Sequence, residues 1–221
     1  MPSIHDGRFN DLRIAYTQLM NAATGSPFIQ VDAEDAADGW PAEKYLIAFT
    51  CKGIARIFPD GTPEYSEHHS MKLELPPGFP CSQPSLRWLT DIWHPNIDHK
   101  TGHVCTNELA NWFPQRSLAD FVVGIAEMVQ YKNYFARNEN PYPVDAEVAK
   151  WVRDVAETKG WIGPEKPVDP RPIQKGGGIM SAGFTERKRP GIRLGIPLPR
   201  KIRFAKPSQP SGLQGDGTEE R

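Results

Sequence analysis

The residues best suited to do chemistry lie between positions 94 and 105. The segment opens with His94-Pro95-Asn96 and ends with Gly102-His103-Val104-Cys105. A cysteine accepts an acyl group only as an accessible thiolate, so Cys105 is a candidate nucleophile for acyl transfer. The simpler interpretation is an inert core thiol, because free cysteine is among the residue types most often buried.

Two other kinds of site remain open for this segment. His94, His99, His103 and Cys105 are all zinc-ligand types, although they lack the paired spacing of common zinc sites. Cys105 with His103 or His94 would also suit a cysteine–histidine hydrolase. That alternative is weakened because the sequence predicts no helix beginning at the nucleophile.

The ordered motifs around this segment resemble those of the ubiquitin-conjugating enzymes. In that family a His-Pro-Asn motif precedes the catalytic cysteine by a short segment that contains glycine, as residues 94–96 precede Cys105. A proline-rich crossing before the motif and a Trp-x-Pro step after the cysteine match Phe79-Pro80 with Pro84, and Trp112 with Pro114. The resemblance covers about residues 8–156.

The resemblance implies a role for each motif residue. Cys105 would receive ubiquitin or a ubiquitin-like protein as a thioester from an activating enzyme, and transfer it to an amine of a protein substrate, with or without a ligase. Asn96 would donate a hydrogen bond to the oxyanion of the tetrahedral intermediate. His94 would hold the loop, and Pro95 would keep the turn extended by fixing its own φ. Because the activating enzyme would consume the ATP, no metal or organic cofactor is implied.

Three departures from the family pattern qualify this expectation. The loop from Asn96 to Cys105 is one residue longer than the common spacing. The acid that many members place on the acceptor side is missing, and its position aligns with Asn140 or Tyr142, so aminolysis would use another group or the acceptor would not be an ordinary lysine. The last family helix is absent, as in bacterial conjugating-enzyme-like proteins, which makes a bacterial member a further hypothesis.

The alternative function from another class is a binding module. Some family variants keep the fold and bind ubiquitin without conjugating it. Those variants lack the cysteine, so the presence of Cys105 argues for conjugation.

The elements that would position these motifs follow an α+β order. Apolar residues at helical spacing predict an N-terminal helix that ends near Gly25, with Phe9, Leu12, Tyr16 and Leu19 on one face. Helices are also predicted after Ser117, as its N-cap, and after Pro143. Short β-branched and aromatic runs predict an antiparallel meander of about four strands, for which there are five candidate runs: residues 28–31, 45–49, 54–58, 69–75 and 85–89.

Composition divides the 221 residues into a catalytic domain, residues 1–160, and a tail, residues 161–221. The tail is basic and rich in proline and glycine, and it has too few apolar residues to offset the entropy of ordering, so we expect it to be largely disordered. An alternating apolar run at residues 192–198 could add a strand to a partner. A nucleic-acid contact is a weaker hypothesis, since a basic patch alone is unspecific.

Cysteine spacing and hydropathy indicate the compartment. The three cysteines show no paired spacing, so Cys51 and Cys81 are expected to be core or loop thiols in a reducing environment. No apolar run approaches the roughly 20 residues of a transmembrane helix, and the N-terminus lacks a signal pattern. The sequence therefore predicts a cytoplasmic protein without a membrane partner.

Overall fold

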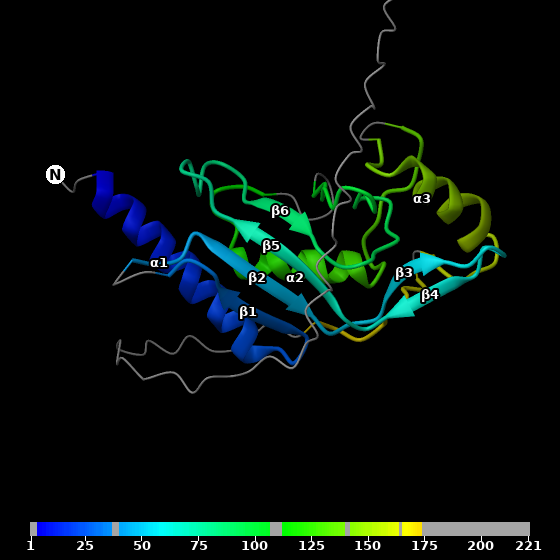
Figure 1. Cartoon of the computed structure of the whole chain (residues 1–221), viewed down its shortest axis with the longest axis horizontal. Helices are drawn as coiled ribbons and strands as arrows, with labels where there is room; N and C mark the ends of the chain where they lie inside the picture. Colours follow the sequence, from blue (N-terminus) through cyan, green and yellow to red (C-terminus); the bar gives the residue numbers. More distant parts are fainter. Residues whose placement is uncertain (1–3, 37–39, 107–111, 140–141, 164, 174–221) are drawn as a thin grey trace, which may run out of the picture. The chain divides into compact units, whose positions relative to one another are not determined.

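The computed structural model describes residues 4–36, 40–106, 112–139, 142–163 and 165–173 (Figure 1). The helices are α1 (Ile4–Gly25), α2 (Leu118–Val129), α3 (Ala146–Trp151) and the π-helix η1 (Val152–Ala156), which continues α3. The strands are β1 (Ile29–Ala33), β2 (Lys44–Phe49), β3 (Gly53–Ile57), β4 (Pro63–Ser66), β5 (His69–Glu74) and β6 (Ser85–Trp88). The predicted α+β class and the helix–strands–helices order are confirmed. None of the helices in these ranges is long and apolar enough to cross a membrane.

The main sheet has four antiparallel strands in the order β1-β2-β5-β6, as the predicted meander requires. One predicted run, residues 54–58, does not join it. β3 pairs instead with β4 in a separate two-stranded hairpin that lies beside α3 (Figure 1). The indole nitrogen of Trp151 donates a hydrogen bond to Gly61 O at 2.9 Å, which holds the tip of this hairpin against α3. β4 was not predicted, because its four residues show no apolar alternation.

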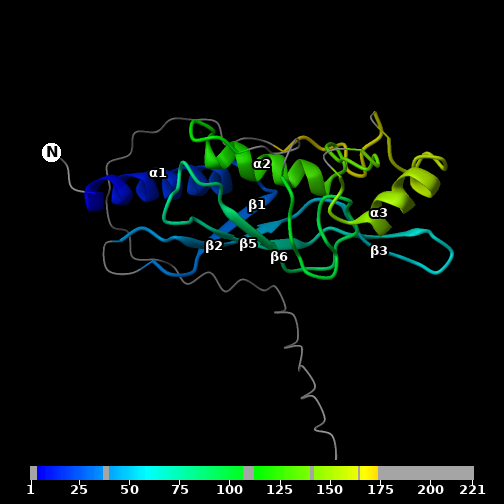
Figure 2. The same ribbon diagram turned by 90° about the horizontal axis from the view of Figure 1, so that it is seen from above.

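The core lies between the sheet and the two long helices, α1 and α2, which cover one face of the sheet (Figure 2). Strand residues alternate, so that Tyr45, Ile47 and Phe49 of β2 point into the core while their neighbours do not. On α1 the predicted face is shifted. Tyr16 is exposed, and Ala15 takes the core position between Leu12 and Leu19.

The start of α2 is capped in a way that the sequence did not predict. Ser117 occupies the N-cap position, but its side chain makes no capping hydrogen bond. The free backbone N–H of Leu118 donates instead to the Gln18 side-chain oxygen of α1 at 2.7 Å. Because the first N–H groups of a helix lack partners within it, this bond ties the two helices together.

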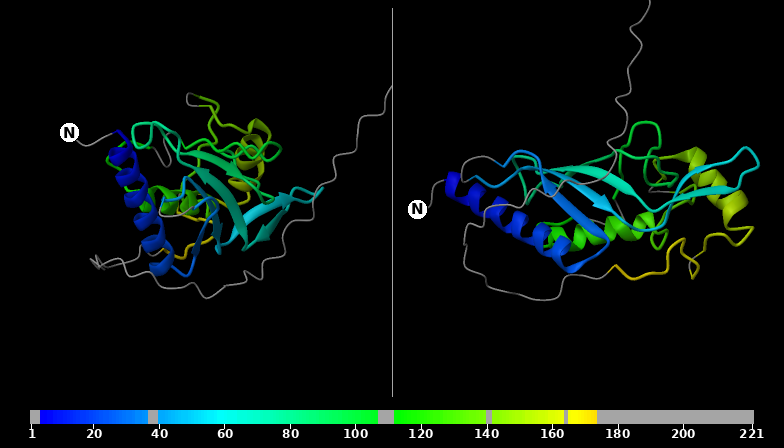
Figure 3. Two further views of the ribbon diagram at one scale, coloured as in Figure 1. Left: turned by 60° about the vertical axis from the view of Figure 1, so that its left-hand side comes forward. Right: turned by 60° about the horizontal axis from the view of Figure 1, so that its bottom comes forward.

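The described structure continues past the predicted boundary at residue 160. Residues 165–173, here called the C-terminal strap, run back from α3 toward the end of α2 (Figure 3). Val168 N and Asp169 N donate to Gln130 O, and the buried Asp169 carboxylate accepts from Lys52 N at 2.8 Å. Composition did not predict the strap, because the strap is held by hydrogen bonds to distant segments rather than by an apolar run. The rest of the predicted tail, including residues 192–198, lies outside the described residues, and its disorder stays a prediction.

We predict that Asp169→Asn lowers the free energy of unfolding by about 2 kcal/mol, since a charged acceptor to Lys52 N and to the Arg171 guanidinium is lost. Urea denaturation followed by circular dichroism measures this change. Glu165→Gln, at an exposed strap position, is the matched control and should leave the midpoint unchanged. Equal midpoints for Asp169→Asn and the parent would contradict a structural role for the strap.

Candidate functional site

A short hairpin, residues 96–105, brings the motif asparagine and the cysteine side by side. Cys105 N donates to Asn96 O at 2.9 Å, and Ile97 bridges Val104 in antiparallel register. Asp98 N donates to His103 O at 2.9 Å. The two residues that the sequence placed nine positions apart are therefore neighbours across one ladder.

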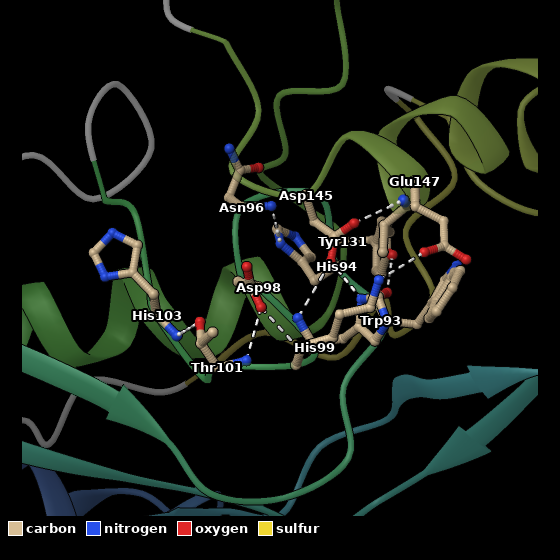
Figure 4. Close-up of polar contacts among 12 residues, drawn as sticks. Trp93, His94, Asn96, Asp98, His99, Thr101, His103, Tyr131, Asp145 and Glu147 are labelled. Atoms are coloured by element: carbon tan, nitrogen blue, oxygen red, sulfur yellow. Dashed lines mark hydrogen bonds and ion pairs between the residues drawn. The ribbon is translucent and has the colours of Figure 1, made fainter. Parts of the chain in front are cut away.

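The turn of this hairpin accommodates the extra residue of the loop. Asp98 Oδ1 accepts from Lys100 N at 2.9 Å and from Thr101 N at 2.7 Å, so the side chain closes the turn (Figure 4). Gly102 follows with φ 74°, and a Cβ there would lie 2.4 Å from Trp88 O. Only glycine tolerates both this positive φ and the close approach of Trp88 O. Beyond Gly102, the pairing of Asn96 with Cys105 is intact.

Asn96 is 3% exposed, and its backbone groups and Oδ1 have defined partners. Its Oδ1 accepts from Phe135 N at 2.8 Å, and its backbone N donates to His94 Nδ1 at 3.2 Å. With Oδ1 held, the direction of the Nδ2 amide group is fixed as well. That group makes no hydrogen bond to any other described residue, which leaves it available as a donor.

His94 lies fully inside the fold beneath this hairpin. Its ring packs at 4.7 Å from the Tyr131 ring, and burial lowers its pKa to about 3. The imidazole is therefore neutral near pH 7 and has no access to solvent. The structure places His94 among the groups that support the loop.

A second set of contacts joins the hairpin to α3 (Figure 4). Asp145 N donates to Pro95 O at 3.0 Å, and Asp145 Oδ1 accepts from Val148 N, which caps α3. Asp145 Oδ2 accepts from His99 N at 3.2 Å and lies 2.5 Å from His99 Nδ1. Sequence reasoning missed this His99–Asp145 pair. The available signal was an aspartate just after Pro143, three residues before an apolar helix position.

The predicted acceptor-side residues are only partly described. Tyr142 is 66% exposed, in the segment just before α3. Asn140 lies outside the described residues. Of the two positions the structure therefore describes only residue 142, and it places a solvent-exposed phenol there rather than an acid.

The three cysteines are unpaired and differ in accessibility. Cys51 is buried, and this burial raises its pKa to about 12, so it is not a nucleophile near pH 7. Cys105 is partly exposed and Cys81 is exposed. The core-thiol interpretation therefore fits Cys51 and does not fit Cys105. Within the described ranges, no three His, Cys, Asp or Glu side chains are grouped to hold a metal ion.

The flanking motifs meet near Cys105, at the end of the hairpin formed by residues 96–105. Trp112 Nε1 donates to Pro80 O at 2.9 Å, which joins the Trp-x-Pro step to the proline-rich crossing. Gln83 Nε2 donates to Thr106 Oγ1 at 2.7 Å, which fixes the residue after the cysteine. Residues 107–111 lie outside the described residues.

Comparison with known proteins identifies relatives of this arrangement. The family described as ubiquitin-conjugating enzyme matches residues 45–158. The chain is 28% identical over 138 residues to ubiquitin-conjugating enzyme E2 21 of Caenorhabditis elegans, covering 58% of this chain and 62% of the relative. It is 29% identical over 93 residues to ubiquitin conjugating enzyme E2 B of Dictyostelium discoideum, covering 42% and 58%. The chain thus spans less than two thirds of either relative.

Solved structures give similar matches. The E2 domain of a Toxoplasma gondii ubiquitin conjugating enzyme is 19% identical, with a TM-score of 0.47, and the match covers 67% of this chain and 88% of that chain. These relatives are all eukaryotic. The bacterial lineage suggested by the sequence stays a prediction.

We predict that the free energy of unfolding decreases as the pH falls from 6.5 toward 4, in part through the buried histidines. Burial lowers the pKa of His69 to about 4 and that of His94 to about 3, against an ordinary value of about 6.5. Below pH 6.5 the unfolded chain binds protons that the folded chain does not, which favours unfolding by up to about 1.4 kcal/mol per pH unit for each histidine.

Urea titrations at several pH values between 7.5 and 4.5 test this prediction. His69→Gln removes one of the two groups and should make the dependence on pH shallower. His68→Gln changes the adjacent exposed histidine and should alter the slope far less, because burial is the main cause of the lowered pKa of His69. A parent slope in His69→Gln would show that His69 does not contribute.

Proposed function

The chain belongs to the ubiquitin-conjugating enzyme family, and from this premise we propose that it carries ubiquitin or a ubiquitin-like protein as a thioester on Cys105. The observation that carries the proposal is the pairing of a partly exposed Cys105 with Asn96 across one hairpin. The partners are an activating enzyme, a protein substrate that supplies an amine, and, where the substrate requires it, a ligase.

The proposed reaction has two acyl transfers. In the first, the Cys105 thiolate attacks the thioester carbonyl that the activating enzyme holds, and the thiolate of that enzyme leaves. In the second, an amine attacks the Cys105 thioester, the C–S bond breaks and an amide forms. Each step passes through a tetrahedral intermediate with a negative oxygen.

Asn96 is the proposed donor to that oxygen in the transfer to the amine. A donor is most effective when its direction is fixed before the reaction, because no reorganisation is then needed. The hydrogen bond from Phe135 N to Asn96 Oδ1 supplies this fixation. The Nδ2 group remains for the intermediate.

The competing functions are supported less well. A binding module of the same fold would have no use for a solvent-accessible cysteine at this hairpin. A hydrolase that uses His94 as base is disfavoured, because burial keeps that imidazole neutral and away from solvent. The Cys105 segment is also non-helical in the described residues, and α2 begins only at Leu118.

We predict that the protein forms a reductant-sensitive adduct with one modifier, and that Cys105→Ala abolishes it. The protein is incubated with an activating enzyme, ATP and candidate ubiquitin-like proteins, and adducts are separated on a non-reducing gel. Cys81→Ala is the matched control, since Cys81 is the other exposed thiol, and it should keep the adduct. No adduct with any modifier, despite a charged activating enzyme, would refute the proposed function.

We predict that Asn96→Asp leaves charging intact and slows discharge to free lysine about 100-fold, the usual cost of losing one oxyanion donor. Aspartate keeps the oxygen that accepts from Phe135 N but has no amide group to donate. The measurement is a pulse–chase of the purified thioester. Loss of charging itself in this variant would show that the role given to Asn96 is wrong.

A further inference from the structure

The acceptor side of the site needs a group that takes a proton. A lysine amine is largely protonated near pH 7 and must lose a proton before it can attack a thioester. At the position where the family pattern places an acid, the described candidate is the exposed phenol of Tyr142. The histidines of the loop are among the other groups near the site that can take a proton.

Two of the three loop histidines are engaged elsewhere. His94 is fully buried, with its pKa lowered to about 3 by that burial. His99 is bound to Asp145, and its ring lies 4.8 Å from the ring of Trp93. His103 is exposed, and its ring forms no hydrogen bond within the described part of the chain. Figure 4 shows this ring on the side of the hairpin away from the His99–Asp145 pair.

His103 and Cys105 lie on the same face of an extended segment. His103 bridges Arg87 of β6, Val104 bridges Ile97, and Cys105 N bonds to Asn96 O. Burial alternates along this segment, with His103 exposed, Val104 buried and Cys105 partly exposed. In such a segment residues two apart point the same way, with their Cα atoms ~7 Å apart. An acyl carbon on the sulfur and an amine attacking it fit between the two side chains.

The backbone of His103 is held while its side chain is free to meet a substrate. His103 N donates to Thr101 Oγ1 at 3.3 Å, and His103 O accepts from Asp98 N. On the β6 side, the residue paired with His103 is Arg87, which is also exposed and lies opposite Lys72 on β5. On the hairpin side His103 lies opposite Asp98, whose Oδ1 accepts from Lys100 N and Thr101 N.

We propose that His103 is a catalytic residue, the base that takes a proton from the incoming amine. This inference rests on the proposed function of Cys105. His103 accepts one proton from the ammonium group, and the freed amine attacks the thioester carbon. The N–C bond forms, the C–S bond breaks, and the Cys105 thiolate leaves and takes the second proton from the nitrogen. The imidazolium then returns its proton to water.

The test compares two nucleophiles on the purified Cys105 thioester. We expect His103→Gln to slow discharge to free lysine about 100-fold, in the usual range for loss of a general base. Discharge to hydroxylamine, which is mostly unprotonated near pH 7, should keep the parent rate. His103→Asp supplies a carboxylate base and should recover part of the lysine rate. His68→Gln, at an exposed histidine between β4 and β5, is the matched control and should behave as the parent.

The outcomes separate this inference from the proposed function. Failure of the parent to charge refutes the proposed function itself. Normal charging with parent rates to lysine in His103→Gln overturns only the role of His103. Equal slowing with both nucleophiles also overturns it, because a base is not needed for hydroxylamine. Slower spontaneous hydrolysis without a change in lysine transfer would assign His103 to water activation instead, and would likewise overturn the proposal.

Discussion

The site depends on the hydrogen bonds of one buried residue, Asn96. Its backbone nitrogen bonds to His94, its carbonyl accepts from Cys105, and its side-chain oxygen accepts from Phe135. Asn96 therefore joins its own motif to two other segments, those of Cys105 and Phe135. A buried polar group left without a partner costs about 1–3 kcal/mol, so displacing any of these segments carries a substantial penalty. The position of the thiol follows from the position of Asn96.

Asp145 likewise joins separate segments, on the side of the His94-Pro95-Asn96 motif that faces α3. It caps α3, accepts from the inserted turn at His99 and donates to Pro95. Loops are usually the most mobile parts of a domain, yet this one is connected at both sides to helices and strands. Such bracing lets irregular backbone hold side chains as firmly as a regular element would.

The sequence was sufficient for features that depend on local pattern. The fold class, the long helices and the strands of the main sheet follow from periodicity, and the order of motifs around Cys105 indicates the family. Features that depend on pairing between distant residues were missed. Gln18 caps α2 from another helix, Asp169 reaches back to Lys52, and His99 meets Asp145, and each of these contacts joins residues far apart in the sequence. The shift from Tyr16 to Ala15 on α1 has the same origin, since the facing helix selects which residue fits.

The cap that Gln18 provides for α2 also affects when the chain can complete its folding. The partner atoms belong to residues 100 positions apart, and those of the Asp169–Lys52 contact are 117 apart. At a synthesis rate of roughly 5–20 residues per second, α1 is completed about 5–20 seconds before Leu118 is added. During that interval its apolar face has no α2 to cover it. The closing contacts are long-range, which slows folding and delays the completed core until nearly the whole domain has been made.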